Sequence, residues 1–397
     1  MDTSEFFKQA EQISDDPYSR IPDHVIPVIK DENNLINVHC HIFNDTIVPK
    51  RIFNIKMPYS RRFVGNLATL LHKIIGRSNE DKLSNLAYFI SLFKSPTEKI
   101  ADKLVSYFDK NSIFCPLMMD MLQGRQRIVR DDEWEKYINL QFQDLNKLFK
   151  QNPKKYNFLP FIPIDPLNEK VYDIFLKAFN GEYGFKPMGI KIYPSLGYLP
   201  SHSVLMNIYK VCQEKNIPIT AHCSSGKTRG FRKHVKNIVG WKVNKQGIWT
   251  QEPESKWFFS GKSYANYFNN PKNWEKVLEA YPKLKLNFGH FGGEYQWNKL
   301  LKGKNNTWVS RIMGYFARYE NVYADISFTN AYPNLFPLIK DRLLSSSLVF
   351  ERTLYGLDYY MVVVRGHYRS LKIDFDVAMG EKIIAKIGKE NPRKFLF

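Results

Sequence analysis

The sequence predicts an α/β fold, a parallel (β/α)8 TIM barrel with helical and loop insertions at one mouth. Short apolar stretches alternate with helical patterns along most of the chain, and this alternation is typical of parallel sheets with helical connections. The length of 397 residues suits such a barrel with insertions. Histidines and other polar residues stand at the ends of several predicted strands, and the carboxyl ends of barrel strands converge on one mouth.

Eight predicted strands account for this pattern. They cover 35–41, 112–118, 157–163, 189–194, 217–222, 284–290, 321–326 and 352–358. Helices are predicted at 134–151, 168–179, 203–215, 274–281 and 376–388. The alternative is an open doubly wound sheet, which the absence of a glycine-rich phosphate loop after an early strand disfavours.

The chain divides into an arm and a barrel. Residues 1–34 predict an N-terminal helical arm with an irregular lead-in, and residues 35–397 predict the barrel domain. Two insertions interrupt the barrel, at about 44–110 and about 224–270. The first contains helical patterns and is hydrophobic enough to pack over one mouth of the barrel. The second is polar and too long for an ordinary connection between a strand and a helix.

Composition narrows the classes of partner. The formal net charge is +19, but the basic residues are scattered and form no dense block, so we expect no nucleic-acid partner. No run of 18 apolar residues and no apolar leader follow the polar N-terminus, so we expect no membrane span and a cytoplasmic protein. The cysteines lack metal-type spacing and indicate free thiols in a reducing compartment. They are Cys40, Cys115, Cys212 and Cys223.

Six residues at or within the predicted strands could carry chemistry. They are His39 and His41 in the first strand, Lys191 in the fourth, His222 in the fifth, His290 in the sixth and Asp358 in the eighth. His39 and His41 are two residues apart and therefore project to the same side of a strand. Each residue also has a plain structural explanation: a strand-end histidine can be a hydrogen-bonded core residue, and Asp358 can be a helix N-cap. Lys191 is harder to explain in this way, because a buried lysine is unfavourable without a partner.

This ordered set resembles the amidohydrolase superfamily of metal-dependent hydrolases. Within it, the stretches NVHCHIF, GIKIYP, PITAHCS, LNFGHFGG and LYGLDYY are similar in style to the aminocarboxymuconate-semialdehyde decarboxylase-like branch. So is the ending IGKENPRKFLF, and the resemblance covers about 35–397. The two insertions are long for the family, so the resemblance does not identify the substrate.

The resemblance implies one divalent metal ion, with zinc expected and manganese or iron as alternatives. The implied ligands are His39, His41, His222 and Asp358. Asp358 would also accept a proton from a metal-activated water, and His290 would polarise a substrate oxygen or shuttle a proton. Lys191 has two interpretations, a carboxylated lysine that bridges two metals or a free ammonium that binds a substrate carboxylate. Arg229 and Arg232, at the basic start of the second insertion, are candidates for binding an anionic substrate under an aromatic-rich lid.

Three functions remain open from the sequence. The first is a metal-dependent hydrolase of a small, acidic amide, ester or lactone. The second is a decarboxylase of a small carboxylic acid that uses the same metal without oxidation. The third is a non-catalytic binding protein on the same barrel. The partner in each case is a small molecule, and homo-oligomerisation is left open.

Overall fold

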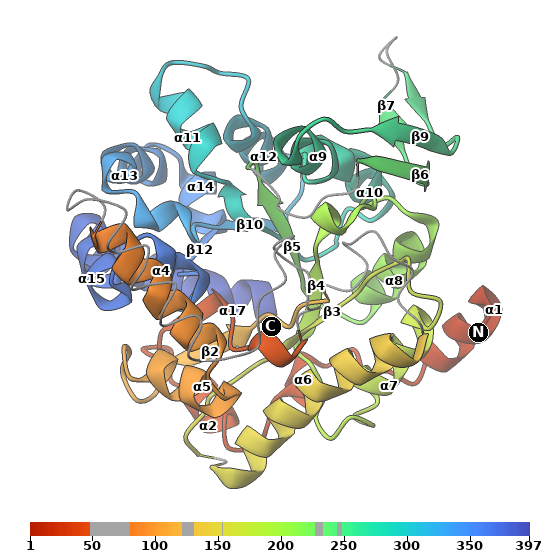
Figure 1. The fold of residues 1–397 in the computed structure, drawn as a ribbon, viewed down its shortest axis with the longest axis horizontal. Helices are drawn as coiled ribbons and strands as arrows, with labels where there is room; N and C mark the ends of the chain where they lie inside the picture. Colours follow the sequence, from red (N-terminus) through yellow and green to blue (C-terminus); the bar gives the residue numbers. More distant parts are fainter. Residues whose placement is uncertain (48–79, 121–130, 153, 227–232, 244–247) are drawn as a thin grey trace.

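The computed structural model describes residues 1–47, 80–120, 131–152, 154–226, 233–243 and 248–397. Eight parallel strands run through its centre and helices surround them (Figure 1). The strands are β1 Ile36–Cys40, β2 Ile113–Pro116, β3 Phe161–Pro163, β4 Gly189–Ile192, β5 Ile219–Ser224, β10 Leu286–Gly292, β11 Val322–Asp325 and β12 Thr353–Leu354. Six of them pair in the order β12-β11-β10-β5-β4-β3, and β1 pairs with β2.

Two further joins close the strands into a barrel. Between β2 and the segment before β3, the amide of Phe114 donates to the carbonyl of Asn157 at 2.9 Å. Between β1 and the segment after β12, the amide of Val38 donates to the carbonyl of Tyr355 at 3.0 Å, and the amide of Asp358 donates to the carbonyl of His39 at 2.9 Å. The predicted (β/α)8 barrel is therefore confirmed, and the open doubly wound alternative is wrong.

Burial on both faces explains the near-continuous apolar strands. All residues of β1 and of β10 are buried, as expected for parallel strands covered by helices outside and side chains inside. The outer helices include α6 Asp131–Gln151, α7 Val171–Phe179, α8 Ser203–Glu214, α10 Glu275–Ala280, α11 Glu294–Leu301, α12 Trp308–Phe316, α13 Phe336–Ser345 and α14 Ser347–Arg352. Among the described helices, none has both the length and the apolar character needed to cross a membrane.

The end of the chain differs from the predicted helix at 376–388. The structure has α15 Tyr368–Met379 and then α16 Glu381–Ala385, with Gly380 between them at a φ of 85°. A residue in this left-handed region cannot continue an α-helix, and glycine adopts it without a steric penalty. A π-helical turn and α17 Asn391–Leu396 complete the chain.

The first insertion places helices beside the carboxyl end of β12. It contains η2 Asp45–Ile47, α4 Glu80–Phe93 and α5 Thr97–Val105, while residues 48–79 of this insertion, with part of its predicted helical pattern, lie outside the described residues. α4 packs against the short helix η8 Met361–Val364, which follows Asp358. The rings of Phe89 and Tyr360 lie 5.5 Å apart at this contact.

The second insertion is more ordered than the polar loop that the sequence predicts. β6 His234–Ile238 pairs with β9 Glu254–Trp257, and β7 Lys242–Val243 pairs with β8 Trp249–Thr250, both antiparallel. α9 Gly261–Phe268 follows. A small apolar cluster holds this unit together and includes Leu199, Val235, Ile238, Phe258, Tyr264 and Phe268. Short alternating segments of this kind are easily hidden in a lysine-rich sequence, because only one face of each strand is apolar.

The N-terminal residues form α1 Thr3–Ala10, η1 Pro17–Arg20 and α2 Ile26–Lys30. α1 packs against α7 and α8 on the outside of the barrel. The guanidinium of Arg20 donates to the carbonyl oxygens of Lys215 and Asn216, which ties the lead-in to the end of α8. The predicted division at residue 34 stays a prediction.

Candidate metal centre

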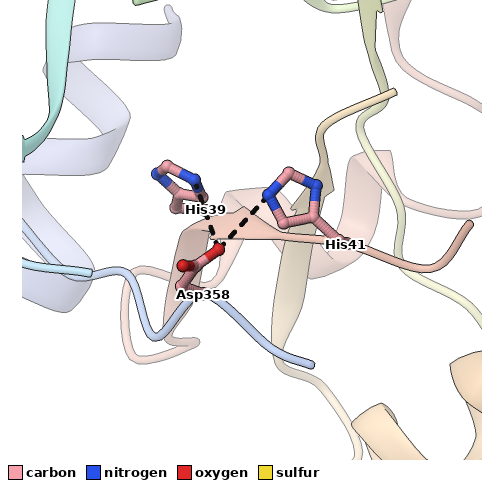
Figure 2. Close-up of side chains that lie close together, drawn as sticks. All are labelled: His39, His41 and Asp358. Carbon is pink, nitrogen blue, oxygen red and sulfur yellow. Dashed lines mark ion pairs between the residues drawn. The ribbon is translucent and has the colours of Figure 1, made fainter. Parts of the chain in front are cut away.

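His39 of β1, His41 just after this strand and Asp358 beyond β12 converge inside the barrel (Figure 2). The Oδ1 atom of Asp358 lies 3.2 Å from Nε2 of His41 and 3.6 Å from Nε2 of His39. All three side chains are buried. Asp358 has a φ of 52°, a left-handed conformation that aspartate tolerates better than most residues. The hydrogen bond from its amide to the His39 carbonyl fixes its position next to β1.

The hydrogen bonds of the two imidazoles show which ring nitrogen carries the hydrogen and which has a free lone pair. Nδ1 of His39 lies 2.9 Å from Oδ2 of Asp325, and Nδ1 of His41 lies 2.9 Å from the carbonyl oxygen of Leu117. These oxygens accept hydrogen bonds, so each neutral ring carries its hydrogen on Nδ1. Each Nε2 therefore presents a lone pair towards Asp358.

This arrangement fits a divalent cation. Nε2 of His39 and Oδ1 of Asp358 are buried and have no hydrogen-bond partner. Burial lowers the pKa of His39 to about 4, and nearby Lys191 also lowers it, so its ring is neutral at pH 7. Burial raises the pKa of Asp358, but its interactions with the nearby His41, His290 and His39 together lower it more, so Asp358 is ionised. Two imidazole lone pairs and a carboxylate that face one another repel unless a cation lies between them.

A second group of candidate ligands, His39, His290 and Asp325, does not leave room for a cation in this way. Asp325 Oδ2 accepts hydrogen bonds from His39 and from Asn287, at 2.9 and 2.7 Å. Its Oδ1 accepts from the amide of His290 at 3.1 Å, from the amide of Ser327 at 3.1 Å, and from the Ser327 hydroxyl. Hydrogen atoms thus surround this carboxylate, and the first group is the better metal site.

His222 and His290 form a pair next to this network. Nδ1 of His290 lies 3.1 Å from the carbonyl oxygen of Ser327 and therefore carries a hydrogen. Nε2 of the neutral His290 ring then accepts a hydrogen bond from Nδ1 of His222, at 3.0 Å. This leaves Nε2 of His222 with a lone pair. Burial, and then the charge of His290, lower the pKa of His222 well below its usual range. His222 belongs to neither three-residue group whose ligand atoms lie within 4.8 Å of one another.

Lys191 is buried on β4, and its ammonium has no hydrogen-bond partner. Burial lowers its pKa to about 8, against the raising effect of the charges of Asp325 and Asp358. Lys191 lines a small apolar recess at the mouth of the barrel. The other lining residues are Met118, Met119, Asp120, Pro163, Ile164, Tyr193, Leu196 and Tyr198. The ring of Tyr193 packs edge-on against His222, with 4.5 Å between the centroids, so the recess adjoins the histidines.

The remaining predicted site residues, Arg229 and Arg232, lie outside the described residues. The aromatic residues near them divide: Phe258 is buried in the small cluster of the insertion, while Phe259 is 96% exposed. Sequence reasoning missed Asp325, Ser327 and Asn287. Asp325 stands between Ala324 and Ile326 at the end of an apolar strand. This is the signal that singled out Lys191, so it could have been found.

Comparison with known proteins agrees with the fold. The family model described as Amidohydrolase matches residues 36–397. No curated protein matches the chain. Among solved structures, 5-carboxyvanillate decarboxylase from Novosphingobium aromaticivorans, complexed with manganese and 4-hydroxy-3-methoxy-5-nitrobenzoic acid, has 12% identity and a TM-score of 0.52. The similarity covers 92% of this chain and 97% of that chain.

Two further structures are similar. A mutant of 5-carboxyvanillate decarboxylase with manganese has 13% identity and a TM-score of 0.50, over 92% of this chain and 98% of that chain. 2,6-Dihydroxybenzoate decarboxylase from Rhizobium has 15% identity and a TM-score of 0.48, over 92% of this chain and 98% of that chain. At these identities the structures with a TM-score of at least 0.50 show a shared fold. The match to the family model, which extends over most of the sequence, shows that the chain belongs to the amidohydrolase family of metal-dependent enzymes.

Proposed function

We propose that this protein is a hydrolase that uses a divalent metal ion, expected to be zinc, on a small amide, ester or lactone with an acidic group. One observation carries the proposal: the lone pairs of His39 and His41 face the ionised carboxylate of Asp358 in a buried space. His39, His41, His222 and Asp358 would hold the metal. The tautomers support this set, because hydrogen bonds leave a lone pair on Nε2 of each of the three histidines.

A divalent ion at this site would lower the pKa of a water molecule and polarise a substrate carbonyl group. The protein residues supply the proton transfers. Asp358 is ionised and lies beside the site, so it can accept the proton of the attacking water and deliver it to the leaving group. His290 accepts the Nδ1 hydrogen of His222, which keeps the lone pair of His222 on Nε2 for the metal, and we expect His290 to polarise a substrate oxygen or to shuttle a proton.

Lys191 suggests why the substrate is acidic. A buried ammonium without a partner is unfavourable, and a substrate carboxylate bound beside Lys191 would provide the missing partner. Binding by Arg229 and Arg232 remains a prediction from the sequence.

Non-oxidative decarboxylation is the second candidate. Its specific support is the fold shared with 5-carboxyvanillate decarboxylase, whose structure contains manganese and a nitrobenzoic acid. In that reaction a proton must replace the departing carbon dioxide. Lys191 is buried beside the recess, and with a pKa of about 8 it is still protonated at pH 7 and could supply this proton.

Metal analysis and product analysis test both candidates. The purified protein is analysed for bound metal and is then screened against small amides, lactones and aromatic carboxylic acids. A hydrolase incorporates oxygen from labelled water into its product, whereas a decarboxylase releases carbon dioxide without this incorporation. Full activity in protein stripped of metal would refute both candidates.

A further inference from the structure

We propose that Asp325 is a positioning residue that aims His39 at the metal and links His39 to the His222–His290 pair. This inference rests on the proposed metal site. Asp325 ends β11 and is fully buried. Its side chain reaches across the position of β12 to a histidine of β1, so it joins strands that are not neighbours in the barrel.

Asp325 accepts more hydrogen bonds than an ordinary buried contact between two side chains would supply. Five hydrogen bonds reach its two oxygens, from the ring of His39, the amide group of Asn287, the backbone of His290, and the backbone and hydroxyl of Ser327. Donors arranged in this way favour the ionised form of a carboxylate, and an ionised carboxylate is a strong acceptor for the Nδ1 hydrogen of His39.

An ionised acceptor at Nδ1 does two things for a metal ligand. It fixes the tautomer, which keeps the lone pair on Nε2, and it increases the electron density of the ring, which strengthens the bond to a cation. It also prevents the ring from rotating, since rotation would break the bond to Asp325. The sequence keeps space for this contact: a β-carbon at Gly356 would lie 2.8 Å from Cβ of His39 and 3.5 Å from Cβ of Asp325.

The same carboxylate controls the second histidine pair. The amide of His290 points at Oδ1 of Asp325 from a left-handed backbone with a φ of 67°. Non-glycine residues rarely adopt this conformation, so the hydrogen bond helps to hold it. Ser327 completes the link, because its Oγ lies 3.0 Å from Nδ1 of His39 and 3.0 Å from Nδ1 of His290. One aspartate and one serine thus orient both histidines.

Two variants and a control test the role of Asp325. Asp325→Asn keeps the size of the side chain and removes its charge. Ser327→Ala removes one donor and the bridge between the histidines. Asp376→Asn is the matched control: Asp376 lies on α15 outside the barrel and accepts hydrogen bonds from Tyr355 at 3.0 Å and Lys372 at 2.7 Å. Dissociation constants for Zn²⁺ and Co²⁺ are measured by competition with a chromogenic chelator, together with the visible spectrum of the Co²⁺ protein.

We expect Asp325→Asn to weaken binding of both ions by about 10- to 100-fold and to change the Co²⁺ spectrum, as loss of a group that orients a ligand does. Ser327→Ala should weaken binding by about 2- to 10-fold, the effect of one hydrogen bond. Asp376→Asn should bind as the wild type does. The spectrum separates positioning from mere structural support, because it depends on how the ligands surround the ion.

Each alternative outcome decides the question. If Asp325→Asn melts at a lower temperature but binds both ions with the wild-type constants and spectrum, Asp325 is only structural and the inference is overturned. If Asp325→Asn does not fold, Ser327→Ala decides: wild-type affinity and spectrum in that variant overturn the inference. If the wild-type protein binds neither ion, the proposed metal site itself is wrong and the role of Asp325 is refuted with it.

Discussion

β11 and β12 are neighbouring strands of the barrel, and a buried aspartate stands near the carboxyl end of each. Asp325 is the last residue of β11, and Asp358 follows β12. At the end of β11, hydrogen-bond donors surround Asp325. Beyond the end of β12, Asp358 instead faces the lone pairs of His39 and His41. Both carboxylates are ionised and both contact His39, yet one contacts its Nδ1–H side and the other its Nε2 side. The same residue type at adjacent strand ends thus has two roles, set by the hydrogen atoms around it.

Metal removal should have the largest effect. Of the two aspartates, only Asp358 has an oxygen that no hydrogen-bond donor reaches, so this carboxylate depends on the metal ion for a partner. We expect a chelator to abolish activity and to lower the melting temperature. A ligand at 100 times its Kd stabilises the native state by about 2.7 kcal/mol. Activity and thermal unfolding are measured before and after chelation, and again after Zn²⁺ or Mn²⁺ is restored. An unchanged melting temperature with intact activity would contradict a metal at Asp358.

Asp358→Asn should have the next largest effect. The change preserves shape but weakens a ligand and removes the proposed base, so kcat should fall by about 10²- to 10⁴-fold, with a smaller change in KM. Kinetics are measured with protein whose metal content is known, so that loss of metal and loss of the base can be separated. Asp325→Asn provides the comparison, since it should act mainly on metal affinity. Near-wild-type turnover of Asp358→Asn with full metal would remove Asp358 from the chemistry.

Lys191→Met should raise KM for a carboxylate substrate by about 10- to 100-fold, the contribution of a hydrogen bond between charged groups. Metal content should not change if the ammonium is free. A fall in metal content from two ions would instead favour the carboxylated lysine that bridges two metals. Lys285→Met is the control, because burial also lowers the pKa of Lys285 to about 8, but Lys285 immediately precedes β10 at the end away from the mouth. Unchanged KM in Lys191→Met would leave the acidic substrate without its main support.

Strand-end residues made the barrel and much of its site predictable. Each of the eight predicted segments overlaps a strand of the structure, because short apolar runs that alternate with helices are typical of buried parallel strands. The positions of His39, His41 and Asp358 follow from the same logic, since period-two alternation and barrel closure bring them together. The placement of His222 against His290 could not be predicted, because it depends on the left-handed backbone of His290 and on hydrogen bonds to Ser327.

The division of roles between Asp325 and Asp358 was also beyond the sequence. It depends on which hydrogen atoms point at each carboxylate, and those come from Asn287, Ser327 and the backbone of His290. These donors belong to two different strand ends, so no local pattern reveals them. The pairing of β6 with β9 was missed for a related reason, since its small core combines Leu199 with residues of the insertion.

The smallest expected effect concerns the protonation of His39 in metal-free protein. If His39 were protonated, both aspartates would face a cation and the contrast between them would vanish. Burial lowers the pKa of His39 to about 4, below the value near 6.5 expected in the unfolded chain. Above pH 6.5 neither state binds the proton, so His39 adds no pH dependence there. As the pH falls from 6.5 towards 4, the unfolded state gains a proton that the folded state does not, and stability falls by up to about 1.4 kcal/mol per pH unit. Urea unfolding of chelated protein at pH 7, 6 and 5 measures how the free energy of unfolding changes with pH. His39→Gln should show a smaller change, because its unfolded state binds one proton fewer. The same change with pH in wild type and His39→Gln would show that folding does not lower the pKa of His39, and the buried neutral ring that faces Asp358 would then be wrong.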